Sequence, residues 1–386
     1  IKTLIDAVTI DDKEERNVDK IQLHFVYKLI NTENLPLKIR GVGLFSKIIK
    51  EEEISHKHIT LFIQQIHLMS KVILGPNIHE EILKRSKEIF IYVLKEKDAN
   101  NTRMVKTLHN ELSNKNKNIA IEVKNILMVI TAYFNPELQK YYFDEILNKI
   151  PVEEYTVESV EVLRSFTVNT KNMEGFELLW KILNGNKNTD VIDVAIYSMS
   201  EIFEKKLLDI NIAVDYLLYS FEKVEKEDNI QCMKLFKKII EIYNDEIKED
   251  IIKLDKQKNI LEILLKNYEN YINLDIEKKA KNIYNQAENV EIRINVIFFI
   301  YRMLNNIFDQ NFQPTLWTLW KATILCPNSS TIEKNIFCNI LYRETNIIEN
   351  NPVIREYLYY DIMLDEKKNP PANIIYNEIC LFIKLF

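Results

Sequence analysis

The chain is poor in glycine and proline, with 5 glycines and 9 prolines among 386 residues. Both residues interrupt regular helices, so their scarcity disfavours folds that depend on many tight turns or glycine-rich loops. Gly41 and Gly43 lie inside an apolar helical pattern with no Lys-Ser or Lys-Thr pair after them, which excludes a phosphate-binding loop there. Because Lys, Glu, Leu and Ile are abundant, the composition predicts helix nearly throughout the chain.

Cysteine is scarce too, and no paired spacing relates the four cysteines, Cys232, Cys326, Cys338 and Cys380. Such usage excludes a disulfide framework and favours a reducing, cytoplasmic location. Three of them fall in apolar helical patterns and are expected to be buried, inert thiols, whereas Cys326 precedes a proline and is the most exposed candidate. No histidine follows His109, so a cysteine-histidine pair would need a long-range contact, and nucleophilic catalysis by this chain is not expected.

Histidines with metal-ligand spacing are also lacking. His56 and His58 are two residues apart at a helix start, which directs their side chains to different helix faces. His79 precedes Glu80-Glu81 without the second histidine of a zinc-protease helix. We therefore expect capping or solvated histidines, and no metal and no cofactor.

The chain has neither an excess of basic charge nor a long apolar run. Its formal net charge is −6 and its pI is near 5.7, and no basic stripe stands out, which disfavours nucleic acid as a partner. No apolar run approaches the roughly 20 residues of a membrane span, and the first residues show no signal-peptide pattern. The runs Glu51-Glu52-Glu53 and Lys278-Lys279 are expected to lie on solvated faces. We expect protein partners, and neither nucleic acid nor a membrane.

The clearest structural pattern present is a helical hairpin from Asn172 to Lys206. Its apolar residues recur at helical spacing on both sides of a polar turn, and one such hairpin cannot bury its own apolar face. The turn Asn184-Gly185-Asn186 is expected to adopt left-handed or turn conformations, with Thr189 or Asp190 capping the second helix. Leu319-Trp320-Lys321 repeats the Leu-Trp-Lys of the first helix and indicates a recurring module.

Helical patterns of this kind recur in pairs about every 40 residues along the chain, as in armadillo and HEAT arrays. Among them, the apolar spacing predicts helices from Lys57 to Leu74 and from Ile78 to Lys95, and the last helices from Val353 to Met363 and from Pro371 onward. The predicted fold is all-α, an α-solenoid of armadillo/HEAT-like helical repeats. We expect repeats over residues 1–245, a weaker, irregular helical junction over 246–289, where Lys, Asn and Glu dominate, and further repeats over 290–386. The chain starts without Met and ends in an apolar helical pattern, as expected of an internal piece of something larger.

Several segments carry a family resemblance, in this order: Phe25-Val26-Tyr27-Lys28-Leu29, Ile63-Gln64-Gln65, Ile89 to Lys97, Phe134-Asn135-Pro136-Glu137-Leu138, Phe176-Glu177-Leu178-Leu179-Trp180 and Asp190 to Ala195. Their order and spacing, from about Asp19 to Lys206, resemble the N-terminal non-catalytic region of the large fat-facets-type ubiquitin-specific proteases. Phe62 and Tyr133 depart from the pattern, because tryptophans are expected there.

The resemblance implies a scaffold segment of a deubiquitinase whose papain-like catalytic domain lies outside this chain. The family's cysteine box, Gly-Asn-Thr-Cys-Tyr, matches the context of none of the four cysteines, and the histidine box is absent too. No catalytic, cofactor-binding or metal-binding residue is therefore predicted. The alternatives are a stand-alone armadillo or HEAT adaptor in transport or complex assembly and, less compatible with the acidic balance, a helical-repeat RNA-binding protein.

Overall fold

The computed structural model describes residues 15–52, 54–96, 101–275, 279, 283–305 and 310–344 of the chain, and these residues form helices and turns with no strand. By their contacts they divide into two compact units, 1–199 and 200–386. The predicted all-α class is confirmed. The last predicted helices, Val353 to Met363 and Pro371 onward, lie outside the described residues.

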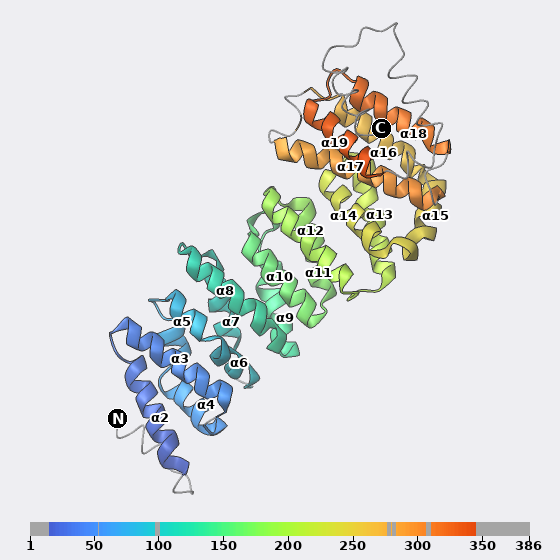
Figure 1. Ribbon diagram of the computed structural model, residues 1–386. Coiled ribbons are helices and arrows are strands. Elements are labelled where there is room, and N and C mark those ends of the chain that lie inside the picture. The colour runs from blue at the N-terminus through green and yellow to red at the C-terminus, as the bar shows by residue number, and fades with distance from the viewer. Residues whose placement is uncertain are drawn as a thin grey trace. The chain divides into compact units, whose positions relative to one another are not determined.

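In the first unit, short loops join a succession of helices: α2 (Glu15–Ile30), α3 (Leu35–Glu51), α4 (His56–Gln65), α5 (Glu80–Arg85), α6 (Lys87–Lys95), α7 (Asn101–Asn110), α8 (Lys117–Ile130), α9 (Pro136–Glu145), α10 (Val157–Thr170) and α11 (Met173–Gly185). Helix α3 packs on α2 and α5, and α8 packs on α5 and α10, so successive helix pairs stack on one another (Figure 1). Helix α12 (Thr189–Glu204) contains the boundary between the units.

The second unit contains α13 (Ile210–Glu227), α14 (Ile230–Tyr243), α15 (Lys248–Lys258), α16 (Ile260–Ile272), α17 (Ile283–Asn305), α18 (Gln313–Trp320) and α19 (Thr331–Arg343). Helices α13 and α14 form a pair, and α17 packs against α14, α16 and α19. Both units are thus stacks of helix pairs, which is the architecture of an α-solenoid of armadillo/HEAT-like repeats. The predicted boundaries at residues 245 and 289 stay a proposal.

Asparagine begins many of these helices. The Oδ1 atoms of Asn34, Asn116, Asn135, Asn172 and Asn229 each accept a hydrogen bond from a backbone N–H in the first turn of the following helix. These bonds satisfy donors that have no partner within the helix, and replacing such a cap typically costs about 1 kcal/mol. The many asparagines of this chain therefore help to define the helix boundaries.

The predicted hairpin is present, but its turn differs from expectation. All six apolar positions predicted for its second helix are buried, Ile192, Ala195, Ile196, Met199, Ile202 and Phe203. No glycine among the described residues has a positive φ, so Gly185 is simply the last residue of α11, and Asn186 is extended with φ −74°. The cap of α12 is the Oδ1 of Asn188, which accepts from the backbone N–H of Asp190 at 3.0 Å, and not Thr189 or Asp190.

Two helices predicted as continuous are broken in the structure. The predicted helix from Lys57 to Leu74 ends at Gln65, His67 takes a left-handed conformation with φ 50°, and a π-helical turn, η1 (Leu68–Ile73), follows. The predicted helix from Ile78 to Lys95 is divided at Ser86, whose Oγ donates to the backbone oxygen of Leu83 at 2.7 Å. Periodicity missed both breaks because the apolar spacing continues across them.

Lys279 also departs from prediction. It was expected on a solvated face, yet its side chain is 1% exposed and its Nζ lies 3.0 Å from Oε2 of Glu333, which is 0% exposed. The same ammonium donates to the backbone oxygen of Asn328 at 2.9 Å. A buried ammonium requires such partners, and spacing along the sequence gives no sign that Glu333 would supply one.

Candidate functional site

The cysteines are held as structural residues in the described part of the chain. Cys232 and Cys338 are buried as predicted. Cys326, expected to be the most exposed, is only 7% exposed, because it packs against the end of α16 and its Sγ donates to Oδ1 of Asn273 at 3.2 Å. Burial raises the pKa of the Cys232 thiol to about 12, which opposes formation of a nucleophilic thiolate. Cys380 lies outside the described residues.

The histidines considered as metal ligands make separate contacts. Nε2 of His56 lies 2.6 Å from Oε1 of Glu96, and Nδ1 of His58 lies 3.0 Å from Oδ2 of Asp19. His79 caps α5 by accepting from the backbone N–H of Glu81 at 3.2 Å. Within the described residues, no three His, Cys, Asp or Glu side chains come together as a metal site would require.

An exposed surface of the first unit brings charged, aromatic and aliphatic side chains together. On α8 and α10, Lys124 and Glu161 form an ion pair, with Nζ 2.7 Å from Oε2. One turn along α10, the guanidinium of Arg164 lies 5.9 Å from the ring centroid of Tyr197 on α12. We call this surface, with Ile121 on α8, the α8–α10–α12 face. Tyr197 is 64% exposed and Ile121 is 43% exposed, so the face presents apolar area among fixed charges.

Sequence reasoning did not single out this face. The apolar stripe of the second hairpin helix omits Tyr197, which falls on the same side as the exposed residues Asp190 and Asp193. An aromatic side chain on the polar side of an otherwise regular amphipathic helix was the available signal. Its partner Arg164 comes from a different hairpin, and no local pattern connects the two residues.

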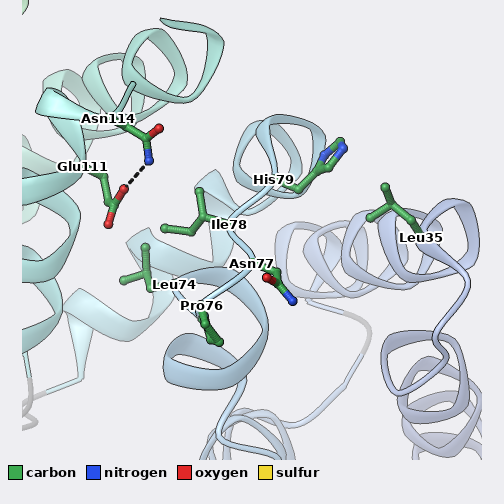
Figure 2. Close-up of a pocket in the computed structure, with 9 residues that line it drawn as sticks. Leu35, Leu74, Pro76, Asn77, Ile78, His79, Glu111 and Asn114 are labelled. Carbon is green, nitrogen blue, oxygen red and sulfur yellow. Dashed lines mark hydrogen bonds between the residues drawn. The ribbon is translucent and has the colours of Figure 1, made fainter. Parts of the chain in front are cut away.

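A pocket of about 690 Å³ lies beside the loop that follows η1 (Figure 2). Leu74, Pro76 and Ile78 supply much of its apolar wall, and Glu111 and Asn114 stand on the other side, joined by a hydrogen bond of 2.6 Å. The loop is tightly wound: a Cβ on Gly75 would lie 2.4 Å from the backbone oxygen of Lys71, so the position requires glycine.

A second pocket, of about 880 Å³, shares Leu74 with the first and lies between α4–η1 and α6–α7. We call it the η1 groove. Its lining is mixed, with apolar, hydroxyl, carboxamide and charged side chains. The two pockets thus adjoin one irregular segment of the chain, from His67 to His79.

No protein-family model matches the chain, and comparison with curated proteins gives no significant match. Among solved structures, it is similar to an engineered protein at 14% identity over 58% of this chain and 96% of the other, with a TM-score of 0.31. It is also similar to yeast importin-beta at 13% identity over 100% of this chain and 56% of the other, with a TM-score of 0.36. A further importin-beta structure is similar at 11% identity over 97% of this chain and 54% of the other, with a TM-score of 0.33.

The chain spans about half the length of these importin-beta structures. At such low identities and TM-scores, these likenesses carry no argument about function. None of the three is a ubiquitin protease. Separately, no helix in the described part of the chain is long and apolar enough to cross a membrane.

Proposed function

We propose that this chain is a protein-interaction scaffold and that the α8–α10–α12 face is a partner-binding surface. The observation that carries the proposal is the exposed Tyr197 ring with Arg164 over it. Tyrosine and arginine are enriched at the energetic centres of protein interfaces, because each combines a large apolar area with directed polar groups. The Lys124–Glu161 ion pair on the same face adds fixed charges that would select among partners.

A photo-crosslinking experiment tests this surface. Benzoylphenylalanine in place of Tyr197 is expected to form a covalent adduct with a discrete partner protein in cells. Arg164→Glu should weaken that adduct several-fold, whereas Lys181→Glu, a charge reversal on an exposed residue of α11, should not. The same photoreactive residue at Tyr284, which is 81% exposed in the second unit, serves as the positional control. Adducts of equal yield at both positions would contradict the proposal.

We further infer that the parent protein is a fat-facets-type ubiquitin-specific protease, acting in the cytoplasm as a thiol protease. Support comes from the order of sequence motifs between Asp19 and Lys206 alone. In such a protein the catalytic domain would hydrolyse the isopeptide bond after the C-terminal glycine of ubiquitin. This segment would recruit substrates or position that domain, and would itself carry no catalytic residue.

The alternative is a stand-alone armadillo or HEAT adaptor in transport or complex assembly, which would have the same fold and the same kind of surface. A hydrolysis assay on a fluorogenic ubiquitin C-terminal substrate separates the two. Activity in the full-length protein but not in this chain would support the protease scaffold. Activity in neither would favour the adaptor, and activity in this chain would overturn both.

A further inference from the structure

The η1 groove has the size and lining of a ligand site. Its volume of about 880 Å³ falls within the roughly 300–1,000 Å³ typical of such sites. Ile63, Val93 and Met104 contribute apolar side chains from three different helices, α4, α6 and α7. These three helices belong to the same compact unit of the structure.

The backbone beside the groove is irregular. His67, which lines the groove, has φ 50° and ψ 44°, a left-handed conformation that costs energy for a residue with a Cβ. The next residues form the π-helical turn η1 and not an α-helix. Single π-turns and left-handed residues of this kind are concentrated at functional sites, where the surrounding structure maintains them.

One wall of the groove contains a buried acceptor, the carboxamide oxygen of Asn101, that has no partner among the described residues. Asn101 is 5% exposed, and its Nδ2 donates to the backbone oxygens of Glu96 at 3.0 Å and Val93 at 3.5 Å. Within the part of the chain that the structure describes, its Oδ1 accepts no hydrogen bond. A buried carboxamide oxygen without a donor is unfavourable, and a ligand N–H would satisfy it after a small side-chain adjustment.

Two charged side chains that line the groove, Glu96 and Arg103, differ in their contacts. The carboxylate of Glu96 already pairs with His56, at 2.6 Å. Arg103, in the first turn of α7, is exposed, and among the described residues its guanidinium has no ion-pair partner. A guanidinium is the side chain best suited to hold a carboxylate through two parallel hydrogen bonds.

We propose that the η1 groove binds an extended peptide segment of a partner protein, with an acidic side chain next to an aliphatic or aromatic one. The peptide carboxylate pairs with Arg103, the apolar side chain enters between Ile63 and Met104, and a peptide N–H reaches Oδ1 of Asn101. This proposal names a partner class and therefore rests on the proposed scaffold function. The carboxamide of Gln64 on the groove wall offers a further donor and acceptor to the peptide backbone.

Fluorescence anisotropy with defined peptide pools tests the proposal on the intact 386-residue chain. The probe is a fluorescein-labelled pool, Gly-Ser-X-Asp-X-Ser-Gly, with X an equimolar mixture of Leu, Ile, Val and Phe. Matched pools carry Asn or Lys in place of Asp. The Asp pool is expected to bind about tenfold more tightly than the Asn pool, and the Lys pool more weakly than either, because only the carboxylate pairs with the guanidinium.

Three variants make the result specific to the groove. Arg103→Glu should reverse the preference between the Asp and Lys pools, and Thr107→Trp, which fills the groove, should weaken binding of every pool by about tenfold or more. The control Lys106→Glu reverses an exposed charge on the same helix but outside the groove, and should leave all affinities within about twofold. Circular dichroism confirms that each variant folds.

Equal affinity for the Asp and Asn pools, or an unchanged preference in Arg103→Glu, would overturn the groove proposal. The crosslink at Tyr197 distinguishes this outcome from failure of the scaffold function. If the crosslink persists while the pools are not discriminated, the groove assignment is wrong and the scaffold stands. If both fail, the scaffold function itself is rejected.

Discussion

The two units each contain a buried polar contact, and these two contacts differ in charge. In the first unit, Nδ1 of His109 lies 2.8 Å from the hydroxyl of Tyr142, and burial lowers the pKa of His109 to about 4, so the buried contact is neutral. In the second, Lys279 and Glu333 form a buried ion pair, in addition to neutral buried contacts such as that between the hydroxyls of Tyr268 and Thr323. A neutral hydrogen bond needs little compensation, whereas a buried ion pair is stable only with close geometry and further hydrogen bonds.

The ionic contact in the second unit belongs to a larger cluster around Tyr271. Lys279 Nζ lies 5.7 Å from the ring centroid, and the guanidinium carbon of Arg293 lies 4.8 Å from it. Arg293 in turn makes two hydrogen bonds to the carboxylate of Asp228, at 2.6 and 2.9 Å. Burial raises the pKa of Tyr271 to about 12, so the ring stays neutral between the cations. The second unit thus depends on specific charged contacts between distant segments.

The largest effect that separates the two units is expected from Lys279→Met. The substitution leaves the buried carboxylate of Glu333 without its cation, and breaking a buried pair on one side costs about 3–5 kcal/mol. Urea denaturation measures the loss, and hydrogen exchange by mass spectrometry should locate it in the second unit. The control Lys253→Met removes the cation of a surface pair whose lysine is 66% exposed, and should cost less than about 1 kcal/mol.

An equal loss in both variants would show that burial does not distinguish the two pairs. The double variant Lys279→Met with Glu333→Leu adds a further test, because replacing both partners with apolar residues is often far less costly than removing one. Glu333 also caps α19 through Ser330, so the double variant should lose about 1 kcal/mol from the cap.

The helical architecture could be predicted from the sequence because it depends on local patterns. Apolar spacing and scarce glycine define a helix pair such as α11 and α12 within one stretch of the chain. The breaks at His67 and Ser86 could not be predicted, because a left-handed residue or a hydroxyl bonded to its own turn leaves the apolar spacing intact. The positions of these helix boundaries therefore depend on individual backbone conformations and hydrogen bonds, which the apolar spacing of the sequence does not reveal.

The candidate surfaces were less accessible to prediction than the fold. Arg164 and Tyr197 are 33 residues apart (197 − 164), and only the packing of α10 near α12 brings them together. Arg103 and Ile63 meet in the η1 groove for the same reason. The buried position of Lys279 was predicted wrongly because a lysine beside another lysine usually lies on a solvated face, and its partner Glu333 is remote in sequence.

Lowering the pH should reduce the stability of the first unit before that of the second. The folded-state pKa of His109 is about 4, below the ordinary 6.5, so the unfolded chain binds an extra proton between these values. The stabilisation is fully present above about pH 6.5 and is lost as the pH falls toward 4, by about 3 kcal/mol in total. Stability of the first unit, followed by hydrogen exchange from pH 7 to 4, should fall accordingly, and His109→Gln should remove this dependence. An unchanged slope in the variant would exclude His109 as the cause.

Close steric packing in the first unit can be tested with a pair of glycines on α3. A Cβ at Gly41 would lie 2.8 Å from Cβ of Leu29 and 3.0 Å from the backbone N of Ile30, so Gly41→Ala should cost about 1–3 kcal/mol by separating α2 and α3. A Cβ at Gly43 would meet only the flexible side chain of Arg85, at 3.2 Å, so Gly43→Ala should stabilise by up to about 1 kcal/mol. Thermal unfolding compares the stability of the two variants. If Gly41→Ala stabilises the protein as Gly43→Ala does, helix propensity outweighs the steric contact at Gly41.

The smallest effect is expected from the ion pair on the α8–α10–α12 face. The Lys124 and Glu161 side chains are 20% and 27% exposed, so water and salt screen their attraction far more than that of the buried pair in the second unit. Lys124→Met should cost less than about 1 kcal/mol, and 1 M salt should abolish the difference from the native chain. If Lys124→Met instead costs as much as Lys279→Met, with no response to salt, then the first unit also depends on charged contacts, and the contrast between the units does not hold.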